Sequence, residues 1–151
     1  MWYRVFCRAD VAPAPAELLA ALESEGLSIR GDFRGDDLGW TAVAISLGPG
    51  TPVQVERYLA DADDLRDDLN SWAAYLETLD YSPNNGRLME HVFQSRQMVT
   101  VRRPLDHPNE IEAERACLTI ARLMAFAADG IYQVEGDGWY DGSGELLLKE
   151  Y

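Results

Sequence analysis

Two histidines, His91 and His107, are the side chains of this chain that ordinarily titrate near neutral pH, and both have carboxylates close by in the sequence. His91 follows Glu90, and His107 follows Asp106. A carboxylate that orients an imidazole can make it a general base, but a catalytic site also needs a nucleophile or a water site and an electrophilic partner. No motif supplies those groups. We therefore predict no catalytic residue, and we keep His91 and His107 as residues of an alternative ligand pocket.

The two cysteines, Cys7 and Cys117, are the remaining candidates for nucleophiles or soft metal ligands. Cys7 lies in a segment rich in β-forming residues, and Cys117 lies on the apolar stripe of a predicted helix. A reactive thiol needs a nearby base and an exposed, electropositive setting, which these flanks do not offer. We expect two buried, reduced thiols rather than a disulfide or a metal pair.

Glycine and aspartate are dense near the end of the chain, and this composition suggests a calcium loop. An EF-hand loop needs oxygen ligands at alternate positions, a glycine at the sixth and a glutamate at the twelfth. No register that begins at Asp129, Asp137 or Asp141 provides them. Tight turns account for the same residues, because Asp and Gly tolerate a positive φ. The glycines also match no nucleotide-binding fingerprint, so we predict no metal and no cofactor.

An aromatic and acidic group within these turns is the strongest candidate for a contact surface. It consists of Asp137, Trp139, Tyr140 and Asp141, between two glycine turns. Rigid aromatic side chains are favoured at the centres of protein interfaces, so the group could form a recognition patch. The alternative is that Trp139 packs back over the strands and the long helix, as large aromatic residues most often do.

One long amphipathic helix is predicted to position this region. Asn109 can cap its start with Glu112 three residues on, and Gly130 offers a left-handed position at its end. Apolar residues recur at spacings of three and four along one face: Ala113, Ala116, Cys117, Ile120, Ala121, Met124 and Ala127. A strand over residues 131–134 follows directly, and the two glycine turns and a strand over residues 145–149 complete a β-meander.

The elements before the long helix alternate between strands and helices. The predicted order is strand 2–8, a short helix before Gly26, strands 27–33 and 40–47 as a hairpin, helix 63–79, a helix or strand over 87–95, and strand 97–103. Residues 52–59 either resume the preceding strand or form a further edge strand. The small residues Ala42, Ala44 and Ser46 share one face, which suggests close packing by a helix. Asp61 or Asp63 can cap helix 63–79.

These elements predict one α+β domain over residues 1–151, a two-layer sandwich with a mainly antiparallel sheet and helices on one face. Strand 97–103, the long helix and strand 131–134 form a C-terminal βαβ unit that leads into the meander. The opening order of strand, helix, hairpin and helix resembles the ferredoxin-like plan. That resemblance implies a fold and not a function, because such folds host many activities.

Charge and composition narrow the function. Asp and Glu outnumber Lys and Arg by 26 to 13, for a net charge of −13, which disfavours nucleic acid and anionic membranes as partners. No apolar run approaches the length of a membrane span, and residues 1–6 lack the basic start of a signal peptide. We therefore expect a soluble cytoplasmic protein of bacterial type.

The leading hypothesis is a non-catalytic protein-interaction or regulatory domain that is selective for basic partners. Self-association as a homodimer, through a sheet edge or an apolar helix face, is a second mode of contact. The alternative function is a small-ligand-binding domain or small enzyme with a pocket between sheet and helices. Arg30-Gly31-Asp32 and Arg34-Gly35-Asp36 are two copies of an adhesion tripeptide, to which the sequence assigns no function.

Overall fold

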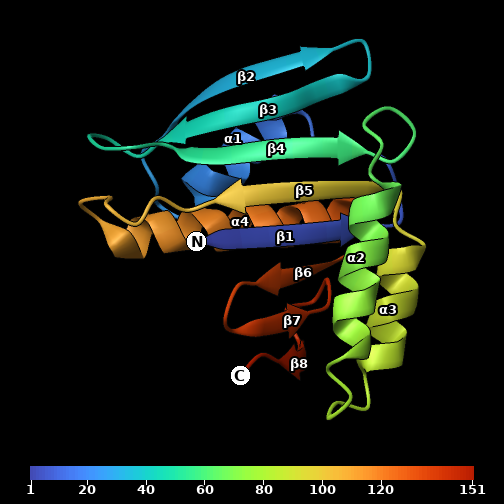
Figure 1. Cartoon of the computed structure of the whole chain (residues 1–151). Helices are drawn as coiled ribbons and strands as arrows, with labels where there is room; N and C mark the ends of the chain where they lie inside the picture. The colour runs from blue at the N-terminus through green and yellow to red at the C-terminus, as the bar shows by residue number, and fades with distance from the viewer.

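One eight-stranded sheet is the framework of the structure, a computed structural model that describes residues 1–151 (Figure 1). The strand order is β2-β3-β4-β5-β1-β6-β7-β8, and every neighbouring pair is antiparallel. The strands are β1 (Trp2–Cys7), β2 (Arg30–Asp36), β3 (Gly39–Ser46), β4 (Val53–Leu59), β5 (Gln97–Arg102), β6 (Gly130–Val134), β7 (Gly138–Tyr140) and β8 (Leu146–Lys149). The helices are α1 (Pro15–Ser24), α2 (Arg66–Glu77), α3 (Asn85–Phe93) and α4 (Glu110–Ala127). The predicted α+β class is confirmed.

Strand β1 lies in the middle of the sheet, between β5 and β6. Val5 is opposite Val99 on one side and Tyr132 on the other. Because β5 and β6 both run antiparallel to β1, they are parallel to each other, and α4 connects them. The predicted βαβ unit is therefore confirmed, with β1 inserted between its two strands. The antiparallel run of β6, β7 and β8 is the predicted meander.

Helices α1 and α4 pack on one face of the sheet and form the larger core with it. The Asn109 side chain caps α4 as predicted, because its Oδ1 accepts a hydrogen bond from the Glu112 backbone N–H at 3.1 Å. Six of the seven residues of the predicted stripe are fully buried, and the seventh, Ala127, is exposed; the buried six are Ala113, Ala116, Cys117, Ile120, Ala121 and Met124. The layer of α1 and α4 on this face gives the predicted two-layer sandwich over the part of the sheet that α2 and α3 do not reach.

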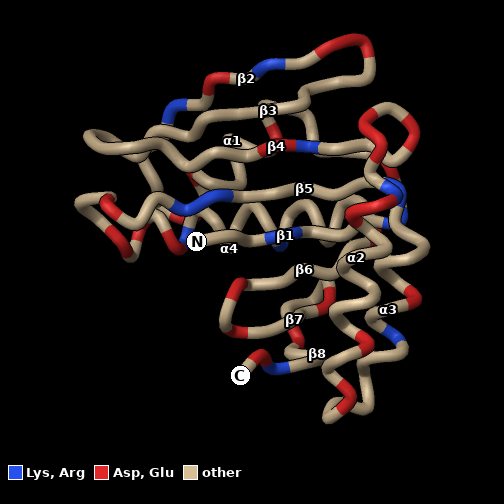
Figure 2. Tube along the Cα trace, in the orientation of Figure 1, with Lys and Arg blue, Asp and Glu red and all other residues tan.

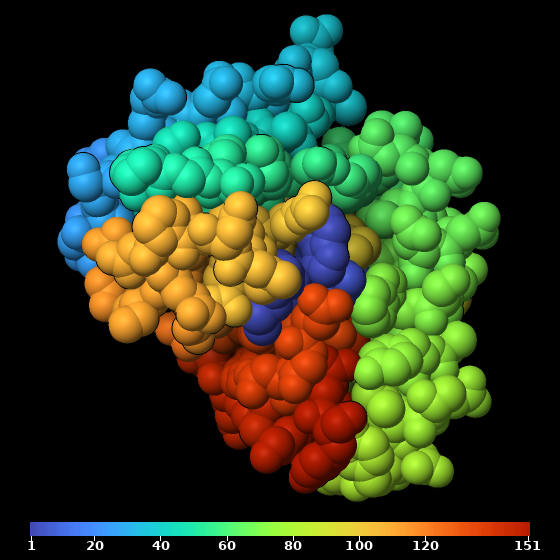
Figure 3. All heavy atoms as spheres, turned by 60° about the vertical axis from the view of Figure 1, so that its left-hand side comes forward, coloured from blue at the N-terminus to red at the C-terminus, as the bar shows by residue number.

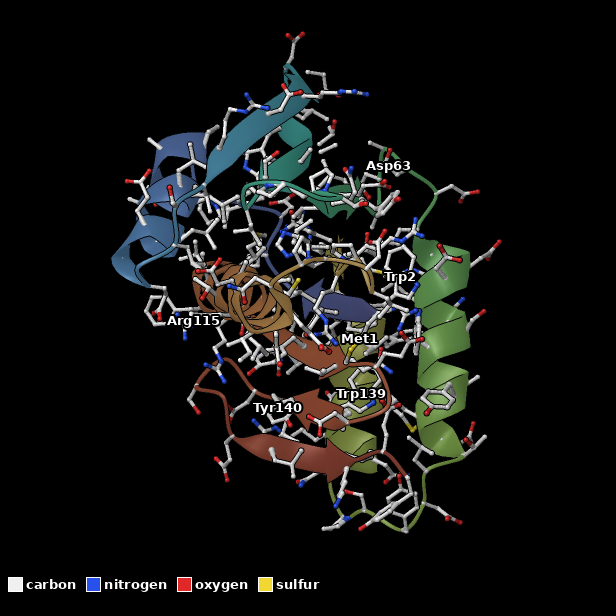
Figure 4. All side chains as sticks on the ribbon, turned by 90° about the vertical axis from the view of Figure 1, so that its left-hand side faces the viewer. Met1, Trp2, Asp63, Arg115, Trp139 and Tyr140 are labelled. Carbon is white, nitrogen blue, oxygen red and sulfur yellow. The ribbon has the colours of Figure 1, made fainter.

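The α2–α3 hairpin covers the other side of β1 and of the meander (Figure 4). Phe6 projects to this side, and its ring stacks on that of Trp139 with the centroids 5.4 Å apart. The Trp72 ring, from α2, packs edge-on against both. This end of the sheet is thus enclosed on two sides, whereas no helix covers the front of β2, β3 and β4 in Figure 1.

The end of α4 differs from the prediction. The residue with a positive φ is Asp129, at 54°, rather than Gly130. Gly130 instead begins β6, where a Cβ atom would lie 2.9 Å from the Cα of Ala125 and 3.2 Å from the carbonyl oxygen of Phe6. The glycine is therefore needed for the close approach of α4 to β1 and not for the turn.

The start of α2 and the strand before it also correct the predictions. Asp63 does not cap the helix, because its carboxylate accepts a hydrogen bond from the Leu59 backbone N–H at 2.8 Å and the N-cap residue is Leu65. Strand β4 pairs with both β3 and β5, so it is an internal strand. On β3, Val43 and Ile45 join the core with α1 and α4. The small residues between them face the side without a helix, contrary to the predicted helix contact there.

Candidate functional site

A groove of about 510 Å³ lies between α2 and the strands β1 and β6. Its walls include Arg4, Trp72, Tyr75, Glu135 and Glu150. Figure 3 shows the start of the chain at the surface here, between α2 and the red C-terminal meander. The groove therefore brings together residues from the two ends of the chain, from Arg4 to Tyr151.

Arginine and tryptophan side chains alternate from β5 across β1 to α2, and two of them, Arg4 and Trp72, line this groove. The Arg102 and Arg4 guanidinium carbons each lie 5.7 Å from the centroid of the Trp2 ring. The Arg4 carbon also lies 4.7 Å from the Trp72 centroid. We call this series, Arg102, Trp2, Arg4 and Trp72, the Arg–Trp ladder. Each contact has the geometry of a cation–π interaction, so the ladder holds its side chains in fixed positions at a partly exposed surface.

Arg4 is the central member of the ladder. Its Nη1 donates a hydrogen bond to Oε1 of Gln133 at 2.9 Å. Burial lowers the pKa of the Arg4 guanidinium, while Glu135 and then Glu150 act to raise it. The Arg4 guanidinium forms no ion pair with a carboxylate; the three ion pairs of the chain involve Arg8, Arg96 and Arg103.

Glu150 joins three separate segments at the floor of the groove. Its carboxylate accepts hydrogen bonds from Gln133 Nε2 at 3.0 and 3.1 Å, from the Tyr75 hydroxyl at 2.7 Å and from the Gly136 N–H at 3.2 Å. Burial and the bond to Glu150 raise the pKa of Tyr75 to about 12, so its hydroxyl stays protonated and donates. This network fixes α2 to the meander, and the groove is therefore formed before any partner binds.

A second cavity, of about 530 Å³, lies where α3 and α4 end beside the start of β6. It is lined mainly by polar side chains, including Arg8, Arg87, His91, Asp129 and Asp141. Arg8 and Asp129 form a two-point ion pair with N–O distances of 3.0 and 3.1 Å. We call this space the histidine cavity.

His91 is held in one orientation at the wall of the histidine cavity. Its Nε2 lies 3.0 Å from the Phe6 carbonyl oxygen, which can only accept a hydrogen bond, so the proton is on Nε2. Burial, and next the charge of Arg8, lower the pKa of His91 and keep the ring neutral at pH 7. Nδ1 is then an acceptor that makes no hydrogen bond within the chain. This is the arrangement that a small ligand with a donor group would need.

The four residues of the predicted patch do not form one surface. Trp139 is fully buried against Phe6 and Trp72, so it offers no area for contact. Tyr140 lies on the other side of β7, where its ring stacks on Tyr132 with the centroids 5.2 Å apart (Figure 4). Its hydroxyl donates to the Asp137 carboxylate.

Asp141, the last residue of that patch, holds a turn at the rim of the histidine cavity. Its Oδ1 accepts hydrogen bonds from the Ser143 N–H at 2.9 Å, the Ser143 hydroxyl at 2.6 Å and the Glu145 N–H at 3.0 Å. Burial acts to raise the pKa of Asp141, but the bonds from Ser143 and Glu145 outweigh it and the pKa is lowered. The Asp–Gly density here is therefore turn chemistry, as predicted.

His107 is not brought to the histidine cavity. Its Nδ1 accepts a hydrogen bond from the Asn109 N–H at 3.0 Å, which takes the place of the reciprocal bond that Glu112 would make in a capping box. The ring is buried beside the loop that contains Gly50. The two predicted pocket histidines thus lie in different places, and only His91 lines the histidine cavity.

The thiols and carboxylates form no further site. Cys7 and Cys117 are free and buried, as predicted, and burial raises the pKa of both to about 12. No three His, Cys, Asp or Glu side chains are arranged so that they could hold a metal ion. None of the helices combines the length and apolarity that crossing a membrane requires.

The groove residues were not singled out by the sequence analysis. Trp2 and Arg4 occupy alternate positions of β1, which places both on one face of the strand, but that face becomes a site only through Arg102 and Trp72. Comparisons with protein-family models, with curated proteins and with solved structures gave no match. Functional proposals therefore rest on the geometry alone.

Proposed function

We propose that the protein is a non-catalytic interaction domain that binds a segment of a partner protein in the groove beside α2. The observation that carries the proposal is the Arg–Trp ladder with Tyr75 beside it. Trp, Tyr and Arg are the residues that most often dominate the energy of protein interfaces. Here they are partly exposed and already ordered, which lowers the entropic cost of binding.

The partner segment is proposed to carry a basic side chain next to an apolar one. Glu135 is exposed at the groove, and only its Oε2 is engaged, by the Trp2 N–H at 3.0 Å. The exposed ring of Tyr151 also lines the groove and can stack on a cation. The net charge of −13 adds long-range attraction for a basic partner and repulsion for nucleic acid. We also propose a cytoplasmic location, which two free thiols support.

A random-peptide library displayed on phage and selected on the immobilised protein tests this proposal. The recovered peptides are expected to be enriched in Lys and Arg. Affinity is then measured by fluorescence polarisation for the native protein, Glu135→Gln and Glu135→Lys. Binding should weaken stepwise, by about tenfold for the charge reversal, because a like-charge contact with the basic peptide replaces an attractive one.

Glu23→Lys is the matched control, because it makes the same charge change on the exposed end of α1. It should leave peptide affinity nearly unchanged. Equal losses for the two reversals would show that only net charge matters and would refute a specific groove. Peptides without basic enrichment would refute the partner chemistry.

A second candidate function, a small-ligand site, is supported by the histidine cavity. The specific observation is the neutral His91 ring, whose Nε2 is engaged by the Phe6 carbonyl, in the lining of a polar space large enough for a metabolite. Ligand-detected NMR with a library of small hydrogen-bond donors tests it. Hits that bind native protein but not His91→Phe would support the site, and hits indifferent to that change would argue against it.

A further inference from the structure

The two edge strands of the sheet, β8 and β2, differ in whether other parts of the chain bond to their outer side. At β8 the loop between α2 and α3 occupies the outer carbonyl groups: the Tyr81 hydroxyl donates to Lys149 O at 2.6 Å, and Asn84 Nδ2 donates to Leu147 O at 2.7 Å. At the opposite edge β2 has nothing beyond it (Figure 1). An open strand edge is a template for pairing with another strand, so β2 is where a partner strand could be added.

The open edge carries an alternating row of charges. Four exposed charged residues lie on one face of β2: Arg30, Asp32, Arg34 and Asp36. Figure 2 shows blue and red segments alternating along β2, next to a β3 without charges. None of the four forms an ion pair within the chain.

The neighbouring strand cannot satisfy these charges. The β3 residues directly opposite the four are neutral and small: Ser46, Ala44, Ala42 and Gly39. The irregularity in this pairing is an extra residue on β3, Thr41, so β2 itself keeps a regular alternation. The charged row is therefore continuous along one face of the edge strand, and within it the Asp36 carboxylate also accepts a hydrogen bond from the Leu38 N–H at 2.8 Å.

The order of the charges matches an antiparallel copy of itself. We propose that two chains associate through β2, with a two-fold axis at Phe33. In that register Arg30 lies opposite Asp36 of the second copy, and Asp32 lies opposite Arg34 of the second copy. Each pair occurs twice, which gives four cross-strand pairs of opposite charge, the arrangement that stabilises antiparallel strands.

The same pattern disfavours other pairings. A shift of two residues places Arg30 opposite Arg34 and Asp32 opposite its own copy, so like charges meet. Parallel pairing in register also aligns like charges. The charge row therefore disfavours these two arrangements, and the proposed register is the antiparallel one that pairs all four charged residues of each strand with opposite charges.

The inner face of β2 is compatible with this dimer. Phe33 would meet Phe33 of the second copy on the side of α1, and Gly31 would lie opposite Gly35. Only a short strand is buried on each side, so the dimer is expected to be weak and dependent on concentration. It uses the far edge of the sheet from the groove, and it does not rest on the proposed function.

Sedimentation equilibrium over a range of protein concentrations up to millimolar tests the inference. A salt concentration of about 0.15 M screens the long-range repulsion between two acidic chains but not close pairs. The single reversals Asp32→Arg and Arg34→Asp each turn two attractive pairs into two repulsive ones. Each should weaken the dimer about tenfold or more.

The double variant D32R/R34D restores opposite charges at both positions and should restore the native dimer affinity. Glu56→Arg, on the same sheet face but on the internal strand β4, makes the same charge change as Asp32→Arg and should have little effect. Circular dichroism checks that every variant is folded. The inference is overturned if the native chain stays monomeric at millimolar concentration, if the single reversals leave the dimer unchanged, or if the double variant fails to recover it. The groove reversal Glu135→Lys should leave the dimer intact, which separates this test from that of the groove.

Discussion

Replacement of Trp139 distinguishes a core residue from a contact residue. The indole is fully buried between Phe6 and Trp72. Truncation of a buried tryptophan to alanine costs about 3–5 kcal/mol. The indole Nε1 is buried without a hydrogen-bond partner, and removing it recovers part of that cost. We expect Trp139→Ala to lower the free energy of unfolding by about 3 kcal/mol, a large part of the roughly 5–15 kcal/mol of a typical domain.

Trp139→Phe separates the two contributions. Phenylalanine keeps the stacking ring and leaves a space of roughly 40 Å³, which costs about 1 kcal/mol at about 24 cal/mol per Å³. Loss of the unpaired N–H returns about 1–3 kcal/mol. The expected stability of Trp139→Phe is therefore within about 1 kcal/mol of the native protein or slightly above it.

Urea unfolding followed by circular dichroism measures both changes. The slope of the free energy with urea should stay constant, so that midpoints can be compared. A loss below about 1 kcal/mol for Trp139→Ala would contradict burial of the ring in the core. Equal losses for the two variants would contradict the unpaired N–H.

Three further predictions follow from buried groups. Burial lowers the pKa of His91 below the 6.5 of an unfolded histidine, so the unfolded chain binds more protons than the folded chain between these two pKa values. The free energy of unfolding should therefore fall as the pH drops below 6.5. Unfolding measured across pH should show this loss in the native protein but not in His91→Gln. A Cβ at Gly130 would meet the Ala125 Cα at 2.9 Å, so Gly130→Ala is expected to cost about 1–3 kcal/mol in urea unfolding. Burial raises the pKa of Cys7 and Cys117 to about 12, and both thiols should resist iodoacetamide in the native protein and react after unfolding, as mass spectrometry would show.

Features set by local spacing were predictable from the sequence. The stripe and cap of α4 depend on contacts within a few residues, so Asn109 and the buried face were identified in advance. The end of α4 was not predictable in this way, because a glycine at position 130 is compatible both with a left-handed turn and with a close contact between α4 and β1. Only the approach of Ala125 in three dimensions decides between them.

The candidate site depends on contacts that no local pattern contains. The Arg–Trp ladder requires the register that sets Trp2 opposite Arg102 and the docking of α2, which brings in Trp72. The charge row of β2 was visible as two repeated tripeptides, but its meaning depends on β2 being an open edge. Trp139 was also identified from the sequence. Its burial follows the tendency of large aromatic residues to pack in cores, rather than their tendency to lie at interfaces.

The most direct measurement is the amide NMR spectrum of labelled protein titrated with a basic peptide from the phage selection. Binding in the groove predicts that chemical shifts change at Trp2, Trp72, Tyr75 and Glu135, while amides around His91 stay in place. Shift changes centred on the histidine cavity, or none at saturating peptide, would contradict an interaction domain that works through the groove.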